Sequence, residues 1–133
     1  MIFLGDEFMK IYIAHSRDFD YKNELYKPIR ESDNLKKYEI VLPHENNNND
    51  PHDREFYKNI ELYICEVSYP ATGLGIELAF AYDDNKPIYC LYKKGNKYSS
   101  SIESITDKII EYDNTNHMIK IIEDIIINYL KDK

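Results

Sequence analysis

Five short runs of β-branched and aromatic residues alternate with helical segments along this chain, and the alternation restricts its fold more than any other feature. Strands that alternate with helices form parallel sheets, because parallel neighbours need crossover connections and a helix supplies one. Those crossovers are almost always right-handed, so few topologies remain. The predicted strands are Lys10–Ala14, Tyr38–Leu42, Leu62–Val67, Ile88–Tyr92 and Lys108–Tyr112.

The fold class that follows is α/β, a five-stranded parallel sheet with helices on both faces. We predict a flavodoxin-like strand order, 2-1-3-4-5, because it is the commonest five-stranded solution. Pro28 is expected to start a new turn or to kink the first helix. Asn114 or Thr115 is expected to cap the last helix, which is amphipathic. A polar surface loop is predicted over His44–Asp53. The predicted helical segments are Tyr21–Asp33, Arg54–Ile60, Gly75–Asn85, a short one near Ile102, and Thr115–Lys131.

Length and charge limit the function classes. The chain has 133 residues, the size of one ordinary domain, so we predict a single domain over residues 1–133. A formal net charge of −7 argues against binding to a nucleic-acid polymer, which requires clustered Lys and Arg. A small phosphate remains compatible with this charge, because a helix N-terminus and one or two cations can hold it.

Localisation follows from three features. No apolar run approaches the roughly 20 residues that span a bilayer, which predicts no membrane partner. The opening segment MIFLGDEFMK has no basic start and carries two acids, so it does not resemble a signal peptide. Cys65 and Cys90 lie inside apolar strand-like runs, which favours two buried thiols over a disulfide. We therefore expect a cytoplasmic protein.

The topology indicates where a ligand would bind. In a sheet of this order, ligands bind outside the C-terminal ends of the strands, near the switch point between strands 1 and 3. That rule selects two loops, His15–Asp20 (HSRDFD) and Ser68–Glu77 (SYPATGLGIE). Gly73 and Gly75 are expected to permit positive φ before the helix begins and to expose amide donors. They do not form a dinucleotide-binding G-x-G-x-x-G, because Leu78 follows three residues after Gly75.

Glu77 is the candidate reactive group in these loops. We predict it in the first helical turn, where the macrodipole favours the ionised carboxylate by roughly 0.3–1 kcal/mol. An ionised, partly buried carboxylate at a ligand crevice can act as a nucleophile or as an electrostatic stabiliser. By itself, the local pattern favours an ordinary first-turn acid, which helices prefer.

A resemblance to a known enzyme family suggests a reaction in which Glu77 would take part. The stretch EVSYPATGLGIELAFAYDDNKPIYCLYKKG (Glu66–Gly95), with KIYIAHS (Lys10–Ser16) upstream and an amphipathic final helix, resembles the nucleoside 2-deoxyribosyltransferase superfamily. Its pattern is most similar to the branch of 2′-deoxynucleoside 5′-monophosphate N-glycosidases. The resemblance implies that Glu77 attacks C1′ of the sugar, displaces the base and forms a glycosyl-enzyme, which water or another base then resolves.

Other positions match the pattern of this family. Tyr12 matches its first-strand tyrosine and Ser16 the serine of the following loop. These matches imply roles in holding the carboxylate or the sugar and in binding a 5′-phosphate. Ser100, or Ser99 beside it, stands where a loop serine reaches the phosphate of a neighbouring subunit. Family members commonly associate so that one subunit completes the site of another, and the resemblance therefore implies a homodimer.

Two positions depart from the pattern. Glu61 stands where the family has an aspartate that helps to orient the sugar or the base. Ala71 stands where transferases carry a second acid and the monophosphate branch carries a phosphate-binding serine. Thr72 could supply a hydroxyl one position later, and His15 and Arg17 could supply positive charge.

The segment after the second strand offers two candidates for the proton donor to the leaving base. His44 and Glu45 follow that strand and are expected to line the same crevice, with one of them donating the proton. The histidines and the acids near them have no metal-ligand spacing. We predict neither a metal nor a cofactor.

The predicted function is cleavage of the N-glycosidic bond, or base exchange, on a small-molecule nucleoside or its 5′-monophosphate. Glu77 is the nucleophile, with Tyr12 and Glu61 as further catalytic groups. The alternative is a non-catalytic nucleotide-binding or sensor module, suggested by Ala71 and Glu61. A phosphorylation-regulated receiver is rejected, because it needs an aspartate where Cys65–Val67 ends the third strand. The loop after the first strand is also poor in the Ser, Thr and Gly that an FMN carrier needs.

Overall fold

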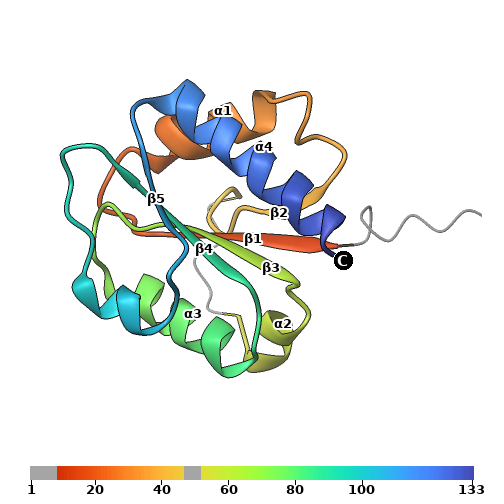
Figure 1. Ribbon diagram of the computed structural model, residues 1–133, viewed down its shortest axis with the longest axis vertical. Helices are drawn as coiled ribbons and strands as arrows, with labels where there is room; N and C mark the ends of the chain where they lie inside the picture. Colours follow the sequence, from red (N-terminus) through yellow and green to blue (C-terminus); the bar gives the residue numbers. More distant parts are fainter. Residues whose placement is uncertain (1–8, 47–51) are drawn as a thin grey trace, which may run out of the picture.

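The computed structural model describes residues 9–46 and 52–133, and these residues form a five-stranded sheet covered by helices on both faces (Figure 1). All strand pairs are parallel and the strand order is β2-β1-β3-β4-β5. The predicted α/β class and the order 2-1-3-4-5 are therefore confirmed. The strands are β1 (Lys10–His15), β2 (Glu39–Val41), β3 (Leu62–Glu66), β4 (Ile88–Lys93) and β5 (Ile109–Tyr112).

The helices divide between the two faces of the sheet (Figure 1). One face carries the π-helix η2, α1 and α4, and the other carries α2, α3 and the 3-10 helix η3. Among the described residues, no helix is long and apolar enough to cross a membrane. The bounds are η2 (Lys22–Tyr26), α1 (Lys27–Glu31), α2 (Arg54–Lys58), α3 (Thr72–Asp83), η3 (Ser100–Ser104) and α4 (Thr115–Lys131).

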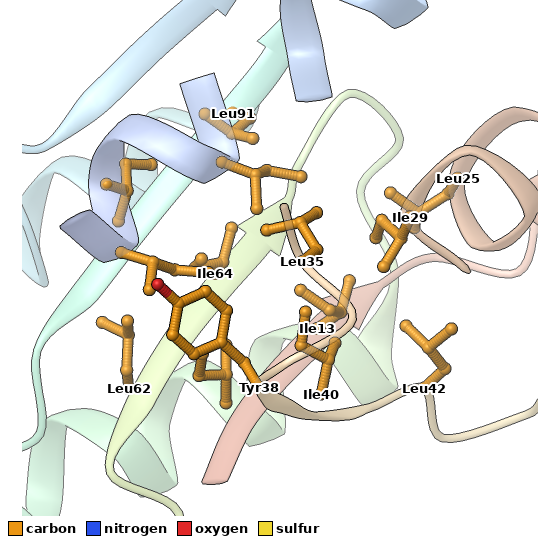
Figure 2. Close-up of a cluster of buried hydrophobic side chains, with 14 of the residues drawn as sticks. Ile13, Leu25, Ile29, Leu35, Tyr38, Ile40, Leu42, Leu62, Ile64 and Leu91 are labelled. Carbon is orange, nitrogen blue, oxygen red and sulfur yellow. The ribbon is translucent and has the colours of Figure 1, made fainter. Parts of the chain in front are cut away.

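Alternating side chains of the central strand build both cores. Leu62 and Ile64 of β3 belong to the cluster under α1 and α4, part of which Figure 2 shows. Tyr63 and Cys65 point the other way, into the cluster under α2 and α3. This period of two is what a pleated strand imposes on a sheet buried on both faces. Cys65 is a buried free thiol, as predicted, and so is its β4 partner Cys90.

Local signals place the first and last helices as expected. Pro28 lies in the first turn of α1, where its fixed φ is tolerated, and the chain changes there from π-helical to α-helical geometry. The side chain of Asn114 caps α4 by accepting a hydrogen bond from the backbone N–H of His117 at 2.9 Å. Of the predicted loop His44–Asp53, residues 47–51 lie outside the described residues. Residues 1–8 of the opening segment do so as well.

The start of α3 differs from the prediction. The helix begins at Thr72 instead of Gly75, so Gly73 and Gly75 lie inside it. Neither has positive φ; among the described glycines only Gly95 does, with φ 92°. The expectation of positive φ before the helix is wrong, because burial of Leu74, Leu78 and Ala81 against the sheet outweighs the roughly 1 kcal/mol that each glycine costs a helix. Glu77 consequently lies in the second turn of α3, not the first.

Candidate active site

A cleft of about 550 Å³ opens at the C-terminal end of β1. Its walls come from β1 and the loop after it, the loop after β2, His52 with α2, and α3 from its N-cap Ala71 to Phe80. This is the switch point of the sheet, where parallel α/β proteins bind ligands. The lining residues are Tyr12, His15, Ser16, Arg17, Asp18, Pro43, His44, His52, Tyr57, Ala71, Gly73, Leu74, Ile76, Glu77 and Phe80.

The carboxylate of Glu77 is held by two phenols. The hydroxyl of Tyr12 on β1 and the hydroxyl of Tyr57 on α2, the latter at 2.9 Å, both donate to Oε2 of Glu77. Burial raises the pKa of Glu77, and these two hydrogen bonds act in the opposite direction. Since Glu77 is not in the first turn of α3, the phenols rather than the helix N-terminus are the main local support for its ionised form.

Both phenols remain protonated donors at neutral pH. Burial, with the charge of Glu77 as the next cause, raises the pKa of Tyr12 far above its ordinary value and that of Tyr57 to about 12. The Tyr12 ring is fully buried and meets the Tyr57 ring edge-on, with centroids 5.6 Å apart. This packing leaves the Tyr12 hydroxyl little freedom to turn away from Glu77.

His15 is buried and neutral. Its Nδ1–H donates to the carbonyl of Ser16 at 2.6 Å, so its Nε2 accepts from the hydroxyl of Tyr26 at 2.6 Å. The same Tyr26 oxygen accepts from the backbone N–H of His44 at 3.0 Å. Burial lowers the pKa of His15 to about 4. The expectation that His15 supplies positive charge is therefore wrong; it lines the cleft as a neutral ring that orients Tyr26.

The buried neutral state of His15 predicts a pH-dependent stability. An unfolded histidine takes up a proton below about pH 6.5, whereas folded His15 resists protonation down to about pH 4. The free energy of unfolding contributed by His15 is therefore complete above pH 6.5 and falls as the pH drops from 6.5 towards 4. Urea titrations across this range are expected to show a smaller fall for His15→Gln than for the wild type.

The comparison with the wild type is needed because Glu66 and Glu77, whose pKa values burial raises, change stability in the opposite direction. His117→Gln, at the exposed start of α4, is the control for replacing a histidine outside the cleft. Equal pH dependence of His15→Gln and wild type would contradict the neutral state of His15.

The loop after β1 places one cation at the cleft. Ser16 is buried, and its hydroxyl oxygen accepts from the backbone N–H of Asp18 at 2.9 Å, which fixes the turn. Arg17, between them, is exposed and lines the cleft. Asp18 also lines the cleft, so the charge around Arg17 is mixed.

Glu61 lies away from the cleft, against the prediction that it is catalytic. It immediately precedes β3, and its backbone N–H donates to the carbonyl of Lys10 at the start of β1. Its carboxylate pairs with Lys133 at 2.7 Å and accepts from the hydroxyl of Tyr129 at 2.9 Å. Glu61 therefore binds the end of α4 at the N-terminal edge of the sheet. His15 lies at the opposite, C-terminal edge, where β1 ends.

Three further predicted residues do not line the cleft. Thr72 and Gly75 line a neighbouring groove of about 500 Å³ between α3 and η3. Ser100 begins η3 and is exposed, while Ser99 and Ser101 on either side of it line that groove. The predicted contact of Ser100 with a second subunit stays a prediction.

Among the cleft residues that the sequence-based prediction does not single out are His52, Tyr57 and Phe80. The His52 ring stacks on Phe56 with centroids 3.8 Å apart. Arg54 lies 4.3 Å from the centroid of the Phe80 ring and joins α2 to the end of α3. Tyr57 and Ile60, three positions apart, indicate a buried side of the predicted helical segment Arg54–Ile60, and both belong to the cluster under α2 and α3. No local signal reveals that the hydroxyl of Tyr57 reaches Glu77.

Metal ions need sets of ligand side chains that lie close together. Among the described residues, no group of three or more His, Cys, Asp or Glu side chains is arranged to hold a metal ion. The groups that the cleft offers for chemistry include the Glu77 carboxylate, the phenols of Tyr12 and Tyr57, the neutral ring of His15 and the guanidinium of Arg17.

Comparisons with known proteins agree with the fold. No family model and no curated protein matches the chain. Among the solved structures that match is that of the Clostridium botulinum CMP N-glycosidase BcmB. The two sequences are 18% identical, the match covers 86% of this chain and 98% of the other, and the TM-score is 0.58. At this identity the likeness is one of fold.

Proposed function

We propose that this chain is an N-glycosidase or base-exchange enzyme of the nucleoside 2-deoxyribosyltransferase superfamily, acting on a nucleoside, a deoxynucleoside or its 5′-monophosphate. The observation that carries the proposal is the carboxylate of Glu77, held by Tyr12 and Tyr57 inside a cleft at the switch point of the sheet. The fold likeness to a CMP N-glycosidase and the sequence resemblance of Glu66–Gly95 support it.

The reaction proceeds by covalent catalysis. Glu77 attacks C1′ of the sugar, the bond between C1′ and the base nitrogen breaks, and its electron pair leaves with the base, which gains a proton. The transition state has oxocarbenium character, which the ionised carboxylate stabilises. Water or a second base then attacks C1′ and releases Glu77. His44 lines the cleft and is the proposed proton donor to the leaving base, since His15 is held neutral.

The other end of the substrate is proposed to lie near the loop after β1. Arg17 supplies positive charge there, and Ser16 fixes the turn that presents it. Gly73 lies in the uncapped first turn of α3, whose backbone amides favour an anion. By resemblance to the family, we further propose a homodimer in which Ser100 approaches the phosphate bound by a second copy.

A substrate panel tests the proposal. The purified protein is incubated with ribonucleosides, deoxynucleosides and their 5′-monophosphates, and released base is measured by chromatography, with and without a second free base as acceptor. Release of base from at least one substrate is the expected result. If the folded protein releases no base from any member, the proposed function is wrong. Tight nucleotide binding that persists in Glu77→Gln, without turnover, would instead support a non-catalytic nucleotide sensor.

A further inference from the structure

Both phenols at Glu77 donate to the same carboxylate oxygen. The hydroxyls of Tyr12 and Tyr57 converge on Oε2, and within the described residues no hydrogen bond reaches Oε1. Two donors on one oxygen leave the other with its lone pairs available. The carboxylate is thus presented asymmetrically, with one oxygen held by protein and the other available to a ligand in the cleft.

Tyr57 is itself held in place on several sides. The side chain of Asp53 caps α2 by accepting from the N–H of Phe56 at 2.9 Å. The hydroxyl of Tyr63 donates to the backbone carbonyl of Tyr57 at 3.1 Å. The centroids of the Phe80 and Tyr57 rings are 5.2 Å apart. Only 6% of Tyr57 is exposed. Its hydroxyl is therefore pre-positioned at Glu77 before any substrate arrives.

We propose that Tyr57 is a positioning residue that acts through Glu77, selecting Oε1 as the attacking oxygen and promoting breakdown of the glycosyl-enzyme. This inference rests on the proposed function. The family resemblance implies only the phenol of Tyr12, on β1. The inference adds a second phenol, that of Tyr57, which lies on a different element, α2.

The two chemical steps use Tyr57 differently. In the first step the bond between Oε1 and C1′ forms, the bond from C1′ to the base breaks, and the carboxylate loses its charge in becoming an ester. In the second step water attacks C1′, the bond between C1′ and Oε1 breaks, and the electron pair returns to Glu77 while water loses a proton to solvent. A donor on Oε2 stabilises the charge that reappears in this second step. Losing the donor therefore slows the second step more than the first.

The test compares Tyr57→Phe with the wild type and with Tyr98→Phe. The Tyr98 hydroxyl donates to Glu103 at 2.6 Å outside the cleft, so its loss removes an exposed phenol–carboxylate bond elsewhere. Phenylalanine keeps the ring of Tyr57, and thermal unfolding checks that the variants fold. In Tyr57→Phe, kcat is expected to fall by about 10- to 100-fold, the effect of one hydrogen bond to a charged group. kcat/KM is expected to fall less.

Two further readouts separate positioning from a merely structural role. Intact mass spectrometry during turnover is expected to show more enzyme carrying one covalent sugar group of the substrate, with its 5′-phosphate where there is one, in Tyr57→Phe than in the wild type. Titration of the Glu77 carboxyl carbon by NMR, assigned with Glu77→Gln and without substrate, is expected to show a higher pKa in Tyr57→Phe because a donor to the carboxylate is lost. Tyr98→Phe is expected to match the wild type in both.

The outcomes distinguish this inference from the proposed function. If the wild type releases base but Tyr57→Phe shows the same Glu77 pKa, the same adduct level and the same kcat, only the role of Tyr57 is overturned. If kcat and kcat/KM fall equally without extra adduct, Tyr57 acts on the first step and the inference is again wrong. If the wild type releases no base, the proposed function fails and the role in deglycosylation fails with it.

Discussion

Glu77→Gln is expected to abolish base release, lowering kcat by about 10³-fold or more on any substrate that the wild type cleaves. The amide is nearly isosteric with the carboxylate and can still accept hydrogen bonds from Tyr12 and Tyr57, but it is a poor nucleophile and cannot stabilise an oxocarbenium centre. The measurement is base release under saturating substrate, with single-turnover kinetics to detect any residual first step.

The unfolding midpoint of Glu77→Gln shows whether a loss of activity comes from the missing nucleophile or from a less stable fold. Burial raises the pKa of Glu77, so replacing a desolvated charge by a neutral amide is not expected to lower the unfolding midpoint. Glu103→Gln is the matched control, because Glu103 also accepts a tyrosine hydroxyl but lies outside the cleft. It is expected to keep full activity. Glu77→Gln with more than a tenth of wild-type activity would show that Glu77 is not the nucleophile.

Ile64→Ala is expected to cause the largest loss of stability, lowering the free energy of unfolding by about 2–5 kcal/mol. Ile64 is 1% exposed in the central strand β3 and belongs to the cluster shown in Figure 2. Truncation removes buried methyl groups and leaves a cavity between the sheet and the helices above it, which a strand bonded on both sides cannot close. Urea unfolding at neutral pH measures the change.

Ile127→Ala is the control for this truncation. Ile127 is 43% exposed on α4, so the same substitution there is expected to change the free energy of unfolding by about 0.5 kcal/mol or less. A loss below about 1 kcal/mol for Ile64→Ala would mean that the site collapses around the smaller side chain, contrary to the packing of this cluster.

The fold was largely predictable because its signals are local. In β3, the apolar run Leu62–Val67 predicts a strand, and the alternation of the side chains between two cores follows from the pleat alone. In α4, the apolar spacing predicts Thr115–Lys131, as the structure has it, and of the two expected caps, Asn114 and Thr115, the structure has Asn114. Crossover rules leave few orders for a chain with this alternation, and the commonest five-stranded order, 2-1-3-4-5, is the one that the structure has.

The start of α3 was not predictable in the same way. Two glycines weaken a helix locally, and that local cost argued for a later start. The burial of Leu74 and Leu78 against the sheet decides the matter in favour of Thr72, and this burial depends on strands that are distant in the chain. Glu77 therefore lies in the second turn of α3 and not, as predicted, in the first.

The sequence by itself determined the α/β topology, the edge of the sheet where a ligand would bind, and Glu77 as the acid near that edge. Only the tertiary structure shows that Tyr57 contacts Glu77 and that Glu61 lies at the opposite edge of the sheet, paired with Lys133. It also shows the burial that keeps His15 neutral. The physical reason is distance along the chain. Periodicity and caps involve residues within a few positions of each other, whereas Tyr12 and Glu77 are 65 positions apart and their hydrogen bond exists only once the sheet has formed.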